Sequence, residues 1–201
     1  HYQFVAPNGL KVLGVQGAWP GAEYALHFPF GSIHEPEDSQ GLAHLLEHMA
    51  FQSGRFFSAD QLRHFFMQNG LDFNRVQAKT HLDQTVFRYR ATQAGTSAVS
   101  TVLRFFSHVV HDLLFLESEI RAEKKVILEE IRSQPWTGSR HQMRLLGMVY
   151  PESRVSQHPP HGLPGPFSSF SAEQCRAFWS RVFAADQATC IIVGPWDESL
   201  I

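Results

Sequence analysis

Apolar and polar residues alternate along several short segments of the chain, and this period of two predicts β-strands. The first two, Tyr2–Val5 and residues 10–15, flank the sequence Pro7-Asn8-Gly9, which is typical of a hairpin turn. Further strands are predicted over residues 23–30, 85–90 and 188–194. The last of these is a continuous apolar run, which is typical of a buried strand.

Other segments repeat apolar residues at intervals of three and four, which predicts amphipathic helices. Ser39 is the candidate N-cap of the first helix, and Ser171 with Gln174 forms a capping box at the start of the last. The region 157–165 is rich in Pro, His and Gly and is predicted to be a loop. The predicted helices span residues 41–51, 58–69, 97–115, 117–132 and 171–183.

Because strands and helices are interspersed and hairpins occur, the predicted class is α+β, with a mostly antiparallel β-sheet packed against helices. The chain has 201 residues, of which 43% are hydrophobic, so it is large enough to bury a core. It contains no internal repeat. A single domain over residues 1–201 is therefore the simplest prediction.

Charge and hydropathy exclude two classes of partner. The formal net charge of −2 gives no electrostatic reason to expect nucleic acid or an anionic membrane. No apolar run approaches the roughly 20 residues of a membrane span, and the longest, residues 99–115, is interrupted by charged residues. We therefore expect no nucleic acid and no membrane. A signal peptide is not evident, which favours a cytoplasmic location, but only weakly, because the chain begins at His1 rather than Met.

Residues 41–51, Gly-Leu-Ala-His-Leu-Leu-Glu-His-Met-Ala-Phe, place polar side chains in an apolar helix. His44 and His48 are four residues apart and share one helix face, with Glu47 beside them. Two imidazoles are a common half-set of Zn²⁺ ligands, and an adjacent carboxylate can accept a proton from the attacking water. The alternative is a histidine-rich helix surface, since the chain has 12 histidines.

A catalytic zinc site needs a third protein ligand. Glu123 and Glu130 lie two turns apart on one predicted helix, with Val126, Ile127 and Ile131 expected to face inward. Glu130 could bind the metal while Glu123 accepts a hydrogen bond from a ligand histidine. From spacing alone, however, a charged face on a surface helix is the better explanation, so the third ligand stays open at this point.

The other histidines and the two cysteines are expected to have structural rather than catalytic roles. Four histidines, in a predicted helix and a loop, are expected to be surface residues or satisfied core residues rather than metal ligands: His108, His111, His158 and His161. Cys175 and Cys190 are not part of a C-x-x-C motif, so we expect buried thiols, with a disulfide as the alternative.

Taken together, these motifs resemble the pitrilysin family of zinc metallopeptidases, which includes insulinase and the mitochondrial processing peptidase. The resemblance covers almost the whole chain. His44, Glu47 and His48 form the family's H-x-x-E-H signature. Residues 8–12 are similar to its opening strand. Residues 123–130 are similar to its downstream glutamate helix, whose later acid is the third metal ligand.

The resemblance implies a zinc endopeptidase that acts on peptides or unfolded polypeptide segments. It assigns one Zn²⁺ ion to His44, His48 and Glu130. Glu47 becomes the catalytic base, and Glu123 becomes a residue of the outer shell around the metal.

The resemblance also implies where the substrate binds. Family members add it as an extra strand to a sheet edge that carries the sequence Asn-Ala-x-Thr. The matching stretch here is Gln77-Ala78-Lys79-Thr80, so Gln77, Ala78 and Thr80 are the expected substrate-binding residues.

The family builds a closed chamber from four related domains, and this chain resembles the first of them. We therefore expect a homologous partner subunit or further C-terminal domains. The alternative is a non-catalytic assembly subunit of a processing-peptidase-like complex, but such relatives usually lose part of the metal motif, which is complete here. A third possibility is a catalytic domain that binds zinc and is inert until its partner is added.

Overall fold

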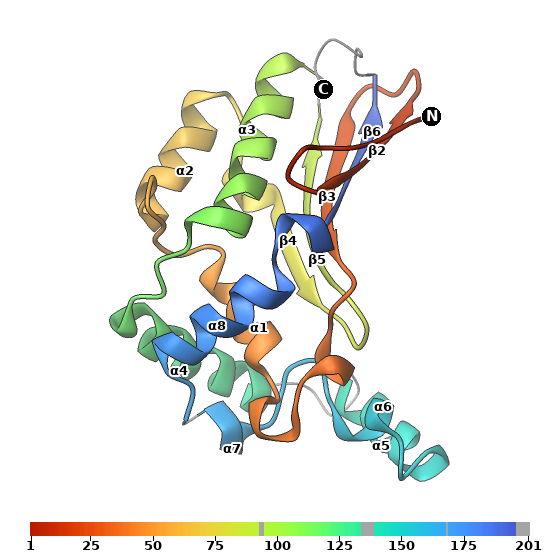
Figure 1. Cartoon of the computed structure of the whole chain (residues 1–201), viewed down its shortest axis with the longest axis vertical. Helices are drawn as coiled ribbons and strands as arrows, with labels where there is room; N and C mark the ends of the chain where they lie inside the picture. The colour runs from red at the N-terminus through yellow and green to blue at the C-terminus, as the bar shows by residue number, and fades with distance from the viewer. Residues whose placement is uncertain (93–94, 134–138, 168, 196–201) are drawn as a thin grey trace.

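The computed structural model describes residues 1–92, 95–133, 139–167 and 169–195. Its centre is a six-stranded sheet with the order β1-β2-β6-β3-β5-β4 (Figure 1). The strands are β1 (Tyr2–Val5), β2 (Lys11–Gln16), β3 (Ala22–Phe28), β4 (Val76–Thr80), β5 (Thr85–Ala91) and β6 (Thr189–Gly194).

All neighbouring strands are antiparallel except β2 and β6, which are parallel. The predicted α+β class with a mostly antiparallel sheet is therefore confirmed. The predicted hairpin joins β1 and β2, and Gly9 adopts a φ of +88° in its turn, which favours glycine. Strand β4 ends the sheet on one side, as the family resemblance implies for its substrate edge.

The helices lie mainly on one face of the sheet and below its lower end, while α5 and α6 project away from the rest (Figure 1). The helices are α1 (Leu42–Met49), α2 (Ala59–Gln68), α3 (Thr96–Ser107), α4 (Glu117–Ser133), α5 (Ser139–Val149), α6 (Arg154–Gln157), α7 (Pro164–Phe167) and α8 (Ala172–Val182). Short 3-10 turns occupy Ser32–His34, Glu37–Ser39, Phe73–Arg75 and Ala185–Gln187.

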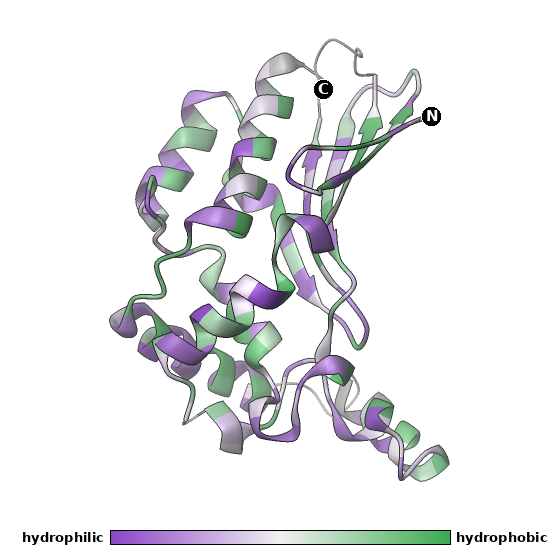
Figure 2. Cartoon of the chain, viewed as in Figure 1, coloured by the Kyte–Doolittle hydropathy of each residue, from purple (hydrophilic) through white to green (hydrophobic). Residues whose placement is uncertain are grey.

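The core lies between the sheet and these helices. Along β3, Tyr24, Leu26 and Phe28 are at most 1% exposed, whereas the alternate residues are less buried. Phe66 of α2 and Phe105 of α3 meet with their ring centres 6.1 Å apart. Figure 2 shows the same pattern as helices that are hydrophobic on one side and hydrophilic on the other. The apolar sides of the strands and of the helices face each other, so the helices cover one face of the sheet.

The expected N-cap of the first helix is wrong. The cap residue of α1 is Gly41, with a φ of +99°, and Ser39 lies in the preceding 3-10 turn. The buried carboxylate of Glu35 accepts hydrogen bonds from the backbone N–H groups of Gly41, at 2.8 Å, and Ala43, at 2.6 Å. A side chain from the preceding loop therefore satisfies two free N–H groups of the helix end.

The helix predicted over residues 97–115 is shorter than expected. It ends at Ser107 and continues as one turn of π-helix, η4 (His108–Asp112). The indole N–H of Trp179 donates to the carbonyl of Val109 at 2.8 Å. A side chain thus satisfies a carbonyl within the π-helical turn, and the chain becomes extended at Leu113.

Three further expectations can be compared with the structure. Val126, expected to face inward, is 45% exposed, whereas Ile127 and Ile131 are buried as expected. Cys175 and Cys190 are free, buried thiols, as predicted. Among the helices of the described residues, none combines the length and hydrophobicity that a membrane span requires.

Candidate metal centre

Helix α1 presents its two histidines on one face and its apolar residues on the other. His44 and His48 lie one turn apart, with side chains 14% and 17% exposed and ring centres 4.8 Å apart. Leu45, Leu46 and Met49 are buried in the core. Their packing holds the orientation of α1, so that both imidazoles point toward helix α4.

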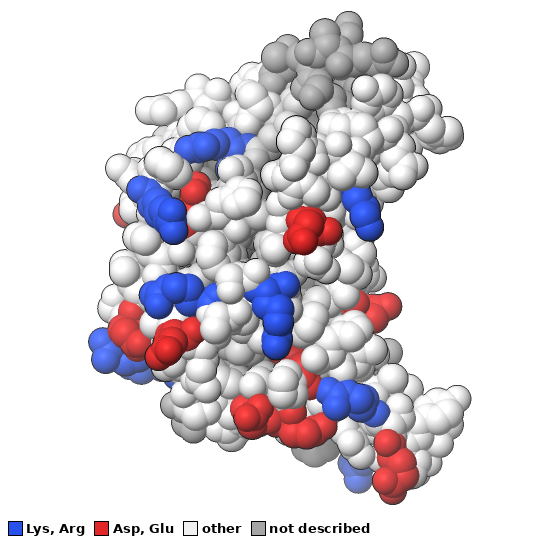
Figure 3. Space-filling model, viewed as in Figure 1, with Lys and Arg blue, Asp and Glu red and all other residues white. Residues whose placement is uncertain are grey.

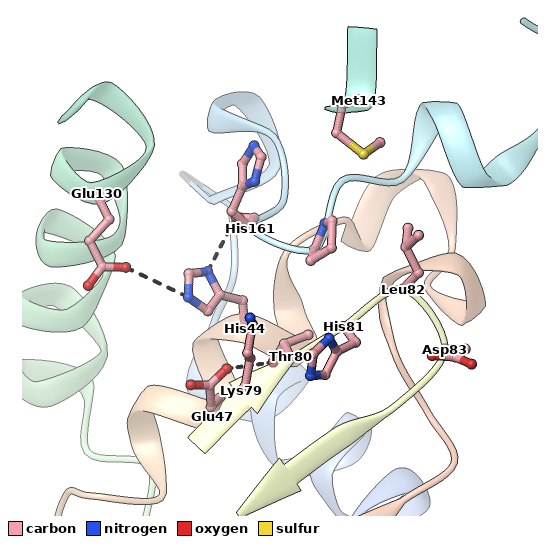
Figure 4. Close-up of a pocket in the computed structure, with 11 residues that line it drawn as sticks. His44, Glu47, Lys79, Thr80, His81, Leu82, Asp83, Glu130, Met143 and His161 are labelled. Atoms are coloured by element: carbon pink, nitrogen blue, oxygen red, sulfur yellow. Dashed lines mark hydrogen bonds and ion pairs between the residues drawn. The ribbon is translucent and has the colours of Figure 1, made fainter. Parts of the chain in front are cut away.

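Helix α4 brings a carboxylate to the same point. Oε2 of Glu130 lies 3.7 Å from Nε2 of His44 and 3.6 Å from Nε2 of His48. One possible ligand atom from each of the three residues lies within 4.8 Å of the other two. Figure 4 shows Glu130 reaching from its helix toward the His44 ring.

These donors fit a zinc ion. In a tetrahedral site with bonds of about 2.0–2.1 Å, two ligand atoms are separated by about 3.4 Å. The separations of 3.6 and 3.7 Å are close to this value. Two neutral imidazole nitrogens and one carboxylate oxygen form a donor set typical of catalytic zinc, with one position left for water or substrate.

Both histidines also have a partner for Nδ1. Nδ1 of His48 lies 2.9 Å from Oε2 of Glu123, whose Oε1 accepts a hydrogen bond from Gln52 at 2.8 Å. Nδ1 of His44 lies 3.4 Å from the carbonyl oxygen of His161. Such partners favour the tautomer in which Nε2 is free to bind a metal.

Glu47 lies on the same helix but does not join the three-residue group. Its Oε2 accepts a hydrogen bond from the hydroxyl of Thr80 at 2.7 Å, and Figure 4 shows the two side chains together. Burial raises the pKa of Glu47, and the hydrogen bond from Thr80 opposes the rise. The carboxylate is therefore held beside the group rather than within it.

The two histidines have opposite pKa shifts. Burial lowers the pKa of His44 to about 4, and the nearby His48 lowers it as well, against the charge of Glu130. Burial also acts to lower the pKa of His48, but the hydrogen bond with Glu123 and the charges of Glu130 and Glu47 outweigh it. The pKa of His48 is therefore raised.

A cavity of about 510 Å³ opens beside the group. Of the three expected substrate-binding residues, Thr80 lines it, Ala78 is half-buried on β4, and Gln77 lies exposed on the opposite face of the sheet. The structure therefore brings only Thr80 to the metal group. The cavity is lined by His44, Glu47, Lys79, Thr80, His81, Leu82, Asp83, Glu130, Met143, Pro160 and His161.

Sequence reasoning missed His81, Met143 and the role of the His161 carbonyl. His81 lies at the β4–β5 turn, where its N–H donates to Gln84 and its carbonyl accepts from Ser32. The only available signal was its position directly after the expected substrate strand.

Comparison with known proteins gives consistent results. The family model described as "Insulinase (Peptidase family M16)" matches residues 19–150. The chloroplastic stromal processing peptidase of Pisum sativum is 28% identical over 189 residues, and that of Arabidopsis thaliana is 27% identical over 193 residues. The crystal structure of the periplasmic protease PqqL from Escherichia coli superposes with a TM-score of 0.90 at 25% identity.

The alignments with these relatives cover nearly all of this chain but a small part of each relative. The alignment with the Pisum sativum protein spans 93% of this chain and 15% of that protein. The superposition on PqqL covers 98% of this chain and 22% of that chain.

Proposed function

Because the chain belongs to the insulinase family of peptidases (peptidase family M16), we propose that it is the catalytic domain of a zinc metalloendopeptidase. Its substrates are peptides or unfolded polypeptide segments. The observation that carries this proposal is the meeting of His44, His48 and Glu130 within 4.8 Å, with Glu47 held next to them.

In this proposal, the nitrogens of the two histidines and the carboxylate of Glu130 hold one zinc ion. When bound, zinc lowers the pKa of a water molecule toward about 7 and polarises the scissile carbonyl. Glu47 accepts the proton of the attacking water and returns it to the departing amine. The hydroxyl of Thr80 orients Glu47 for this task.

Glu123 has a supporting role. Through its 2.9 Å contact with Nδ1 of His48, it keeps the opposite nitrogen of that ring free for the metal. Gln52 fixes the carboxylate from its other oxygen. The supporting network thus connects α1 with α4.

The free edge of β4 supports a site for an extended substrate. A peptide that adds as a strand to this edge bonds through its backbone, and its alternate side chains face the two sides of the sheet. We assign Gln77, Ala78 and Thr80 to this edge. Thr80 faces the metal group, whereas Gln77 faces the open side.

We further propose that residues 1–201 form one domain that acts together with other domains or a partner subunit. The small fraction of each relative that this chain covers supports this. Exposed apolar residues also support it: Leu145, Met148, Val149 and Tyr150 lie on or directly after α5.

The test is the substitution Glu47→Gln, with zinc content and peptide cleavage measured on the same preparation. We expect about one zinc per chain and a loss of turnover of at least about 10³-fold, because the amide cannot accept the proton. The matched variant His44→Ala should lose both the zinc and the turnover.

A Glu47→Gln variant that cleaves peptides as fast as the parent would exclude Glu47 as the base. A parent chain that binds zinc but cleaves no peptide, even with its further domains present, would instead favour the non-catalytic assembly subunit.

A further inference from the structure

The edge strand β4 has a basic side that the proposed mechanism does not use. Along β4, Val76 and Thr80 are buried against the helices, whereas Gln77 and Lys79 are exposed on the opposite, open face. In the neighbouring strand, Arg88 pairs in register with Gln77 and is also exposed. Because side chains alternate along a strand, these residues share the open face.

Three of the cations there form no ion pair within the described residues. Arg90 pairs with Glu23, but no carboxylate of those residues lies within ion-pair distance of Lys79, Arg75 or Arg88. Arg75 and Arg88 line a hollow of about 620 Å³ that also includes Gln77. Figure 3 shows mixed charges on the face seen in Figure 1, so charge of one sign does not cover the whole molecule.

This basic side is continuous with the candidate metal centre. Lys79 also lines the cavity that contains His44 and Glu47. At the β4–β5 turn, burial lowers the pKa of His81, and the charges of Lys79 and Arg88 lower it further, against Asp83. The field of both cations therefore reaches the wall of the cavity.

A substrate strand on the free edge of β4 would place every second side chain on the open face, beside Gln77 and Lys79. Opposite charges on neighbouring strands stabilise the pairing, and like charges destabilise it. The longer side chain of Arg88 extends the same basic surface from the next strand.

We propose that Lys79 and Arg88 make this chain select extended peptide segments that carry Asp or Glu at alternate positions. These carboxylates face the open side of the sheet, while the other side chains face the metal centre. The inference rests on the proposed function, because it names the substrate class of the same site.

The test uses the full-length protein with Glu47→Gln, so that peptides bind without being cleaved. Three fluorescent peptides of equal length differ only at alternate positions, which carry Glu, Gln or Lys. At low salt we expect the Glu peptide to bind about tenfold more tightly than the Gln peptide, and the Lys peptide most weakly. The difference should shrink as salt is added.

A charge-reversal pair locates the effect. Arg88→Glu, combined with Glu47→Gln, leaves Lys79 in place and brings the summed charge of the two positions to zero, so the preference for the Glu peptide over the Lys peptide should be lost. Lys11→Glu makes the same change of charge on β2, which lies four positions away from β4 in the sheet. This control should leave the order of peptide affinities unchanged.

Equal binding of the Glu and Gln peptides, or an equal effect of Lys11→Glu and Arg88→Glu, would overturn the inference. If the parent still cleaves the neutral peptide in a zinc-dependent manner, the proposed function stands without it. If the parent binds no zinc and cleaves none of the three peptides, the proposed function fails and this inference falls with it.

Discussion

Two carboxylates on helix α4 face the histidines, and water reaches them to different extents. The Glu123 side chain is 16% exposed and is held by both His48 and Gln52. The Glu130 side chain is 47% exposed and lines the cavity. An exposed carboxylate can adjust toward a metal at little cost, whereas a paired one orients its neighbour. This difference favours Glu130 as the ligand.

The substitution Glu123→Gln tests the supporting role. The amide keeps the shape of the side chain but loses its charge, so we expect zinc affinity to fall about tenfold. Competition with a zinc-binding chromophore measures this directly. Glu119→Gln is the matched control, because Glu119 lies one turn earlier on α4 and binds Ser53 instead. Unchanged affinity in Glu123→Gln would contradict the assignment.

Glu35 predicts a pH dependence of stability. Burial raises its pKa from 4.5 to about 7, against the hydrogen bonds from Ala43, Gly41 and Leu42. The folded state therefore binds this proton more tightly than the unfolded state. Its contribution to stability is fully present below about pH 4.5 and is lost as the pH rises through about 7. The total change is about 3 kcal/mol.

Urea unfolding of the parent and of Glu35→Gln, between pH 5 and pH 8 with a chelator present, checks this expectation. The amide does not titrate, so the free energy of unfolding of the parent should decrease with pH relative to that of the variant. A difference between the two proteins that does not vary with pH would show that Glu35 is ionised throughout.

The residues of the site were predictable to different degrees for a physical reason. Helical spacing places His44 and His48 on one face wherever the helix lies, so the motif alone indicates the pair. Glu130 needed the family resemblance, since spacing cannot tell which distant helix approaches. The carbonyl of His161 has no signature, because every residue carries one.

At the scale of elements, the loop between α6 and α7 is held against the start of α1 by two glycines. Gly162 has a φ of +77°, and a Cβ atom there would lie 2.4 Å from Cα of Gly41. The hydroxyl of Ser32 binds the carbonyl of His158 at 2.7 Å in the same loop. This packing positions the His161 carbonyl at Nδ1 of His44.

Gly162→Ala should therefore displace the loop and reduce zinc affinity by about threefold to tenfold, in addition to lowering stability. Gly9→Ala is a matched control in the turn of the first hairpin. Gly9 has a φ of +88°, and a Cβ atom there would lie 2.7 Å from Cβ of Asp186, so the substitution should cause a similar strain. Both variants should unfold at lower urea concentration, but only Gly162→Ala should bind zinc more weakly. Equal zinc affinities would rule out a positioning role for the loop.

Element boundaries were harder to predict than element types. The apolar periodicity of α3 continues past Ser107, so its end could not be read from the chain. Helix α5 was not predicted at all. Its apolar residues are distributed as one-sidedly as those of α4 and α8, but Leu145 and Met148 on that helix are exposed rather than packed in the core.

At the scale of the whole molecule, the sheet supports the site from one side and α4 closes it from the other. The fold class followed from strand and helix patterns, because alternation and helical periodicity are local properties. Strand order was not predictable from those patterns. The central place of β6, between β2 and β3, depends on contacts between the two ends of the described chain.

That strand order has a consequence for how the protein is made. Strand β3 ends at Phe28, but the strand that joins it to the first hairpin begins only at Thr189. On the ribosome, the histidine helix emerges long before the sheet that supports it can close. Contacts between such distant segments form slowly. Until β6 has been synthesised, β2 and β3 therefore have unpaired edges, and we expect the nascent chain to be prone to aggregation in that interval.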